Sequence, residues 1–151
     1  KGLCLLNSPK AQGVTGFLRS QGVLALGDLE IQSHNDYATV LAVAMDDKPL
    51  KDSDRILVQV GTTERPAGWK TKPAQVAGHP GQEILSFGHA PWMIVRADVT
   101  LTVKNPRISR ACVLDPNGMP LKEIALQNSP RGASFIFPPD ALYVVLRSNL
   151  P

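Results

Sequence analysis

Hydrophobic residues recur at every second position in several short runs of the chain, which is the period of a β-strand buried on one face. Ile56, Val58 and Val60 form one such set, and the run Asp98–Lys104 contains another. The 3.6-residue period of an amphipathic helix is almost absent. The pattern therefore predicts an all-β chain in which one face of each strand points into a core.

Gly and Pro residues separate these runs, as is typical of turns between strands. The fold class we expect is an antiparallel β-sandwich of two sheets, jelly-roll or immunoglobulin-like. The expected strands are Leu3–Leu6, Val14–Arg19, Leu29–Gln32, Ala38–Met45, Arg55–Thr63, Ile84–Phe87, Trp92–Val95, Asp98–Lys104, Arg110–Leu114, Lys122–Leu126, Ala133–Phe137 and Leu142–Arg147.

Two turns have recognisable chemistry. In LDPNGMPL, Pro116 presets φ for the first turn position, and Asn117 with Gly118 is expected to supply left-handed residues that close a hairpin. In MDDKPL, Asp46 and Asp47 can bond the backbone that follows them.

The longest stretch without periodicity is Arg65–Gln82, RPAGWKTKPAQVAGHPGQ. We expect a loop there, and a loop of this length in a compact domain is usually functional or disordered.

Length and composition point to a single soluble domain. The chain has 151 residues, of which 43% are hydrophobic and 19% charged, and its mean hydropathy is −0.05. We expect one β-sandwich module over residues 1–151, excised from a larger multidomain enzyme because the chain begins abruptly at Lys1. No apolar run is long enough to span a bilayer, and the start lacks the layout of a signal peptide.

Charge gives little support for a nucleic-acid partner. The 16 Lys and Arg residues exceed the 13 Asp and Glu residues by three, but they are scattered along the sequence, with the densest stretch at Lys70–Lys72. We therefore expect neither a nucleic acid nor a membrane as the partner.

The sequence contains no recognisable set of catalytic residues. His34, His79 and His89 occur at unrelated spacings, and neither cysteine lies in the context of a nucleophile. Serine-hydrolase, phosphate-loop and zinc-protease motifs are missing. We expect no enzyme and no catalytic residue; a pocket in which Asp36, His34 or His89 meets another carboxylate would reverse that expectation.

The acidic cluster near position 50 could hold a structural calcium ion through its oxygen atoms, but it lacks the glycine and the terminal glutamate of an EF-hand loop. Turn capping is the favoured explanation, so we expect no cofactor and no metal site. The cluster consists of Asp46, Asp47, Asp52 and Asp54.

Cys4 and Cys112 can form a disulfide only if the first strand lies beside Arg110–Leu114. Two free, buried thiols are the favoured alternative, because both cysteines have apolar neighbours.

Aromatic residues are the candidates for sugar contact, since pyranose rings stack on flat aromatic faces. Trp69, flanked by Gly68 and Lys70, is the residue expected to form an exposed platform, although a Trp that plugs its own loop is an equal alternative. Trp92 and Tyr143 are more typical of core or lid packing. The candidate carbohydrate-binding set is Trp69, Arg65, Lys70, Gln82 and Trp92.

Several segments together resemble a known family. They are NSPKAQGVTGFL, GDLEIQSHNDYATVLAVAMDDKPLKDSDRILVQVGTTERPAGW, FGHAPWMIVRADVTLTV, ACVLDPNGMPL and FPPDALYVVL. The chain resembles the C-terminal accessory β-sandwich domains of clan-A-type glycoside hydrolases, in which a (β/α)8 barrel performs the hydrolysis. The resemblance covers nearly the whole chain, and no catalytic residue is implied because the family's carboxylates lie on the barrel.

The resemblance implies a non-catalytic accessory module of a polysaccharide-degrading enzyme. The expected function is carbohydrate binding, with a polysaccharide or oligosaccharide and the catalytic domain of the same parent chain as partners. The alternative is a structural β-domain that packs on the catalytic barrel and stabilises it. An extracellular or periplasmic location follows from this setting alone. The aromatic share of 5% weighs against a flat-surface binder of crystalline polysaccharide.

Overall fold

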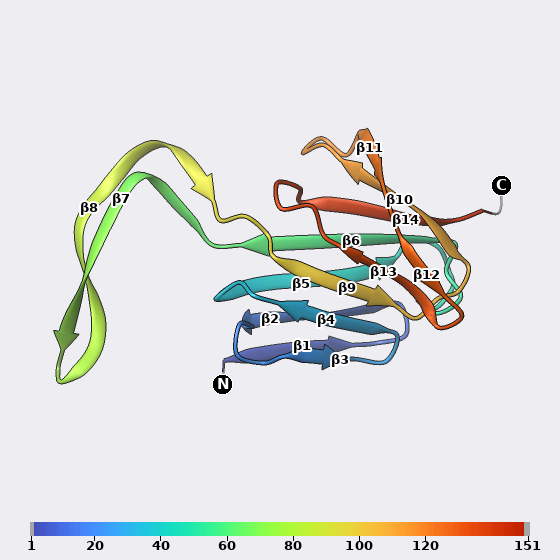
Figure 1. Cartoon of the computed structure of the whole chain (residues 1–151), viewed down its shortest axis with the longest axis horizontal. Helices are drawn as coiled ribbons and strands as arrows, with labels where there is room; N and C mark the ends of the chain where they lie inside the picture. The colour runs from blue at the N-terminus through green and yellow to red at the C-terminus, as the bar shows by residue number, and fades with distance from the viewer. Residues whose placement is uncertain (1, 150–151) are drawn as a thin grey trace. The chain divides into compact units, whose positions relative to one another are not determined.

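The computed structural model describes residues 2–149, in which every paired strand is antiparallel and no helix occurs (Figure 1). A seven-stranded sheet has the order β1-β2-β5-β6-β14-β10-β11, a five-stranded sheet has the order β12-β13-β9-β4-β3, and β7 pairs only with β8. The strands are β1 (Leu3–Asn7), β2 (Ala11–Phe17), β3 (Val23–Ala25), β4 (Leu29–Ser33), β5 (Tyr37–Ala44), β6 (Arg55–Thr62), β7 (Glu64–Val76), β8 (His79–Ile94), β9 (Val99–Val103), β10 (Ile108–Leu114), β11 (Pro120–Ile124), β12 (Gln127–Ser129), β13 (Gly132–Ile136) and β14 (Tyr143–Ser148).

The described chain divides into two compact units. Thr63–Val95 forms one of them, and we call it the ribbon because it consists of β7 and β8. The rest of the described chain forms the other unit, which contains both larger sheets. With no helix present, residues 2–149 also hold no helical segment that could cross a membrane.

The two larger sheets enclose one apolar core, which confirms the predicted all-β sandwich. Val40 and Val58 contribute from the seven-stranded sheet, and Ile31 and Leu101 from the five-stranded sheet. All four are at most 1% exposed. Because successive side chains of a strand point to opposite faces, the residues between them form the outer faces of the sandwich.

The predicted strands of the sandwich are confirmed, with shifts at their ends of at most three residues. Two further short strands, β3 and β12, were not expected. Ile84–Phe87 and Trp92–Val95, which the pattern separates, belong almost entirely to the single strand β8.

The predicted hairpin around Pro116 is confirmed, with one correction. Gly118 has φ 84°, whereas Asn117 does not have a positive φ. The carboxylate of Asp115 accepts hydrogen bonds from the backbone N–H groups of Asn117 and Met119, at 2.8 and 2.9 Å. One left-handed residue, held by an Asp side chain, is therefore enough to reverse the chain here.

Candidate functional site

The segment predicted as a long loop is instead the ribbon. β7 and β8 pair from Glu64 with Ile94 down to Val76 with His79, leaving Ala77 and Gly78 as a two-residue turn. Their φ angles are 50° and 80°, as a type I′ hairpin turn requires. The loop prediction was wrong because neither residue is the Asn or Asp that usually marks the first position of this turn.

The ribbon contains two irregularities in its register, between Pro66 and Ala67 and between Lys70 and Thr71. Gly88 lies near the first one with φ 70°, and a Cβ atom there would meet the carbonyl oxygen of Ala67 at 2.4 Å. Only glycine therefore fits at position 88, and the peptide bond between Ala90 and Pro91 is cis.

Two of the predicted site residues, Arg65 and Trp69, lie together on the ribbon. The Cζ atom of Arg65 is 5.4 Å from the centre of the Trp69 ring. Trp69 also lies directly across from Phe87, with ring centres 5.8 Å apart and planes at 79°. Trp69 is half-buried by these two neighbours, so it is a strand residue in a small cluster rather than an open platform in a loop.

The other three predicted residues do not join this cluster. Lys70 follows Trp69 in the strand, so its side chain points to the opposite face. Gln82 pairs with Pro73, about 13 Å further along β7 at the usual rise per residue. Trp92 pairs with Pro66 and is 61% exposed, so of the core or lid packing expected for it, core packing is wrong.

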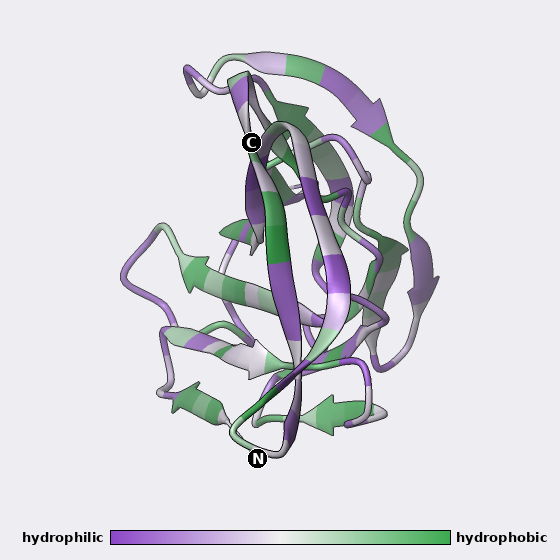
Figure 2. Cartoon of the chain, turned by 90° about the vertical axis from the view of Figure 1, so that its left-hand side faces the viewer, coloured by the Kyte–Doolittle hydropathy of each residue, from purple (hydrophilic) through white to green (hydrophobic). Residues whose placement is uncertain are grey.

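Sequence reasoning missed the apolar character of the ribbon as a whole. Of the 17 large hydrophobic side chains that are exposed in the described chain, eight lie between Thr63 and Val95, and Figure 2 shows hydrophobic stretches along this ribbon. The missed signal is the density of such residues in ILSF and WMIV. The eight are Val76, Ile84, Leu85, Phe87, Trp92, Met93, Ile94 and Val95.

In the sandwich, one histidine does meet a carboxylate. His34 Nδ1 lies 3.1 Å from Asp98 Oδ1, and Asp36 pairs with Arg19 at 2.6 Å. The side chains of His34 and Asp98 are both more than 60% exposed. A hydrated, open pair of this kind lacks the excluded-water environment in which acid–base groups act strongly.

The acidic turn acts as a cap. Asp46 accepts backbone hydrogen bonds from Asp54 at 2.8 Å and Lys48 at 3.2 Å. Partial desolvation favours the neutral acid, but these hydrogen bonds, with that of Ser53, outweigh it and hold the pKa of Asp46 below its ordinary value. The described residues contain no group of three or more His, Cys, Asp or Glu side chains placed to hold a metal ion.

Asp54 is the carboxylate of this turn that pairs with two cationic side chains. It bonds with Lys48, and Arg107 Nη2 and the Ser148 hydroxyl approach Oδ1 at 2.5 and 3.0 Å. The hydrogen bond from Lys48 is the largest influence, and together these partners lower the pKa of Asp54 despite some desolvation.

The cysteines are free. Four strands separate β1 from β10, so Cys4 and Cys112 are about 24 Å apart at the usual strand spacing. Cys4 is exposed and Cys112 half-buried, so the prediction of free thiols is correct but that of two buried thiols is wrong.

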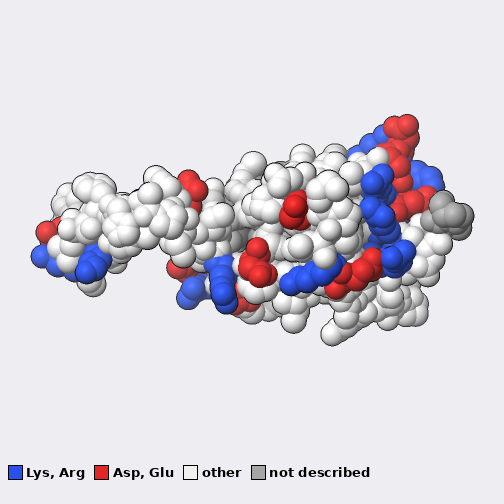
Figure 3. Space-filling model, turned by 90° about the horizontal axis from the view of Figure 1, so that it is seen from above, with Lys and Arg blue, Asp and Glu red and all other residues white. Residues whose placement is uncertain are grey.

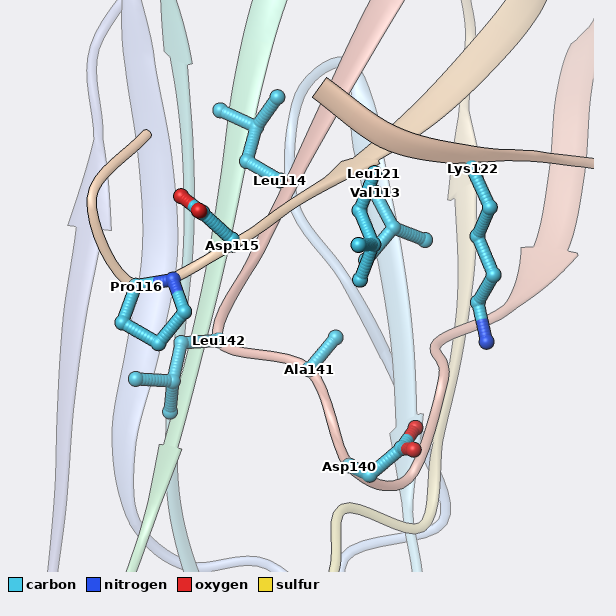
Figure 4. Close-up of a pocket in the computed structure, with 9 residues that line it drawn as sticks. All are labelled: Val113, Leu114, Asp115, Pro116, Leu121, Lys122, Asp140, Ala141 and Leu142. Atoms are coloured by element: carbon cyan, nitrogen blue, oxygen red, sulfur yellow. The ribbon is translucent and has the colours of Figure 1, made fainter. Parts of the chain in front are cut away.

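Two hollows in the described part of the sandwich are small. Figure 4 shows one of about 90 Å³ between the 115–119 turn and the loop at Asp140, with Lys122 at its rim. Another, of about 250 Å³, lies on the outer face of the seven-stranded sheet beside Tyr143 and Gln59. Ligand pockets usually hold roughly 300 to 1,000 Å³, so both fall below that range.

Comparison with known proteins gives no relative: no family model, no curated protein and no solved structure matches this chain.

Proposed function

We propose that this chain is a non-catalytic β-sandwich module that works by attachment to a protein domain, with the ribbon as its contact surface. The observation that carries this proposal is the exposure of eight large apolar side chains on a two-stranded unit. Phe87 is 71% exposed and Trp92 61%. Exposed apolar side chains gathered at one place mark interaction sites, whereas singly scattered ones do not.

The ribbon also lacks a core of its own. Within residues 2–149 its two strands pair only with each other, so each has one unpaired edge along its whole length. A two-stranded hairpin is at best marginally stable in water. A partner that buries these side chains would therefore stabilise the ribbon as well as bind it.

The partner we propose is the catalytic (β/α)8 barrel of a parent glycoside hydrolase, acting on polysaccharide in an extracellular or periplasmic setting. This part rests on the family resemblance of the sequence. In that setting the module is one part of a larger chain and stabilises the barrel on which it packs.

The test is titration of the isolated chain into the barrel that the same reading frame encodes. The triple variant Phe87→Ser, Met93→Ser and Ile94→Thr should abolish binding and the rise in the barrel's Tm. The matched control, Phe17→Ser, Met119→Ser and Ile136→Thr, changes the same residue types at 61%, 62% and 72% exposure on the sandwich. The proposal would be overturned if the two variants reduced binding and the rise in Tm equally. It would also be overturned if the reading frame that encodes this chain did not encode a (β/α)8 barrel.

A second candidate is carbohydrate contact by the ribbon, favoured by the open Trp92 and by Arg65 beside Trp69. Gel retardation by soluble polysaccharides should weaken in Trp92→Ala and Trp69→Ala but persist in Phe17→Ala. Migration that no polysaccharide slows, or equal loss in all three variants, would exclude this candidate.

A further inference from the structure

Three arginines lie side by side across the seven-stranded sheet. Arg147 of β14 is directly opposite Arg55 of β6 on one side and Arg110 of β10 on the other. We call these three residues the arginine row. Neighbouring strands are about 4.8 Å apart. The backbones of Arg55 and Arg110, on either side of Arg147, are therefore about 10 Å apart.

The arginine row points outward. The residues that follow or precede its members, Ile56, Leu146 and Ala111, are fully buried in the core, and alternation places the arginines on the other face. All three arginines are exposed. Figure 3 shows that Lys and Arg side chains gather in a band on the sandwich, with Asp and Glu side chains among them, but it does not mark the individual arginines.

A bulge in β10 completes the row. The register between β10 and β14 shifts between Ile108 and Arg110, so that Arg110 and not Ser109 faces Arg147. The Ser109 hydroxyl is buried and has no hydrogen-bond partner within the described chain. Bulges re-aim side chains, and this one brings a third positive charge beside two others at the expense of an unsatisfied hydroxyl.

The charges of the row are largely uncompensated. Arg110 pairs with Glu123 at 2.8 Å, while Asp54, next to Arg55 in sequence, is bonded to Lys48 and Arg107. Within residues 2–149, neither Arg55 nor Arg147 takes part in an ion pair. Like charges directly opposite on a sheet are destabilising, so the fold retains a small cost that an anionic ligand would relieve.

We propose that the arginine row is a binding site for an acidic polysaccharide, whose repeated carboxylate or sulfate groups pair with successive guanidinium groups. Guanidinium groups bind such oxyanions through two parallel hydrogen bonds. The row sets three exposed arginines on three neighbouring strands of one sheet face, so it fits an extended chain with regularly repeated charges better than a single small ion. None of the three arginines belongs to the ribbon, and the site does not depend on the proposed function.

The same face is a poorer site for single-stranded nucleic acid. Proteins bind such strands by combining positive charge with aromatic side chains on which the bases stack. The positions two residues along from the row are Leu57, Val145 and Cys112, which are aliphatic or small and are half-buried or buried. Val145 is only 3% exposed, so these positions offer no stacking surface.

The experiment measures binding to dextran sulfate, polygalacturonate, neutral dextran and single-stranded DNA at physiological salt. The double variant Arg55→Gln/Arg147→Gln should weaken binding to the acidic polysaccharide by about tenfold or more, the scale of one lost charge-assisted hydrogen bond. The matched control Lys51→Gln/Arg131→Gln removes the same charge from two exposed residues without ion pairs in the described structure, and should change affinity by less than about threefold. Arg55→Lys/Arg147→Lys should also weaken binding, because a lysine cannot bind bidentately.

Retention by dextran sulfate alone assigns a sulfated ligand, and retention by polygalacturonate alone a uronic-acid ligand. Three outcomes would overturn the proposal: equal losses in the two glutamine double variants, tighter binding of DNA than of either acidic polysaccharide, or no binding to either one. The glutamine variant should remain folded, since it removes a repulsion, and its thermal unfolding would verify this.

Discussion

Asn105, whose side chain is fully buried, donates a hydrogen bond from Nδ2 to the carbonyl oxygen of Leu50 at 2.8 Å. The same amide group donates to the carbonyl oxygen of Ser53, also at 2.8 Å. One side chain thus satisfies two backbone acceptors of the turn that ends before β6. It takes the place of a strand partner that this turn does not have.

Replacing Asn105 with Ala should therefore destabilise the sandwich by about 2 kcal/mol or more, because two buried carbonyl groups lose their donor. Urea unfolding followed by far-ultraviolet circular dichroism measures the loss, because both tryptophans lie on the ribbon and would not report on the sandwich. Asn128→Ala, at an exposed position of β12, is the control and should leave the unfolding midpoint unchanged. A loss in Asn105→Ala no larger than that of the control would contradict the assignment.

Asp54 predicts how stability depends on pH. Its pKa is lowered in the folded protein from the ordinary value of 3.8, so its charged form contributes stability that is complete above that value. This contribution is lost as the pH falls through the lowered folded pKa. Asp54→Asn should thus be less stable than wild type at neutral pH, and the difference should shrink in acid.

The measurement for Asp54 is urea unfolding of wild type and Asp54→Asn at pH values of about 7, 4 and 2.5. Asp52→Asn serves as the control because the carboxylate of Asp52 makes no hydrogen bond or ion pair with another described residue. A difference between wild type and Asp54→Asn that stays constant over this range would refute the linkage.

Ala77 should be replaceable with a gain in ribbon stability. Its φ of 50° is left-handed, which costs a residue with a Cβ atom roughly 1 to 2 kcal/mol, and Asn tolerates this conformation better. Ala77→Asn should increase the hydrogen-exchange protection of β7 and β8 amides. Ala77→Val should have the opposite effect, because a branched side chain is least suited to positive φ.

Removing one charge of the arginine row should stabilise the sandwich. Arg147→Gln relieves the repulsion on both sides at once and should raise stability by about 0.2 to 1 kcal/mol at low salt. The gain should shrink as salt is added, because exposed charges are screened. Arg147→Lys keeps the charge and should show no gain; a lower Tm in Arg147→Gln would mean that the row is stabilising.

Period-two patterns predicted the sandwich well because each of its main strands has one face toward solvent and one face buried in the core. β6 begins at Arg55 as predicted, and β9 lies within the predicted run Asp98–Lys104. The same pattern did not predict the ribbon, because neither face of the ribbon packs against a hydrophobic core. Its 16-residue strand β8 therefore has no reason to alternate, and its turn uses Ala77.

The two candidate sites differ in how much the sequence reveals. Arg65 and Trp69 are four residues apart on one strand, so a strand assignment alone would have placed them on one face. Arg55, Arg110 and Arg147 are adjacent only through the order β6-β14-β10 and a bulge before Arg110. No local sequence pattern predicts the strand order or the bulge, so the sequence alone does not predict the arginine row.

The ribbon begins and ends at neighbouring points, since the N–H group of Val95 donates to the carbonyl oxygen of Thr63 at 2.9 Å. In the part of the chain that the structure describes, no sandwich strand pairs with β7 or β8. The segment is therefore an insertion cassette between β6 and β9, which can lengthen, shorten or change sequence without altering any hydrogen-bond ladder of the sandwich. Such a position lets the exposed surface of the ribbon change while the scaffold stays constant, and it offers protein engineers a place to graft other hairpins.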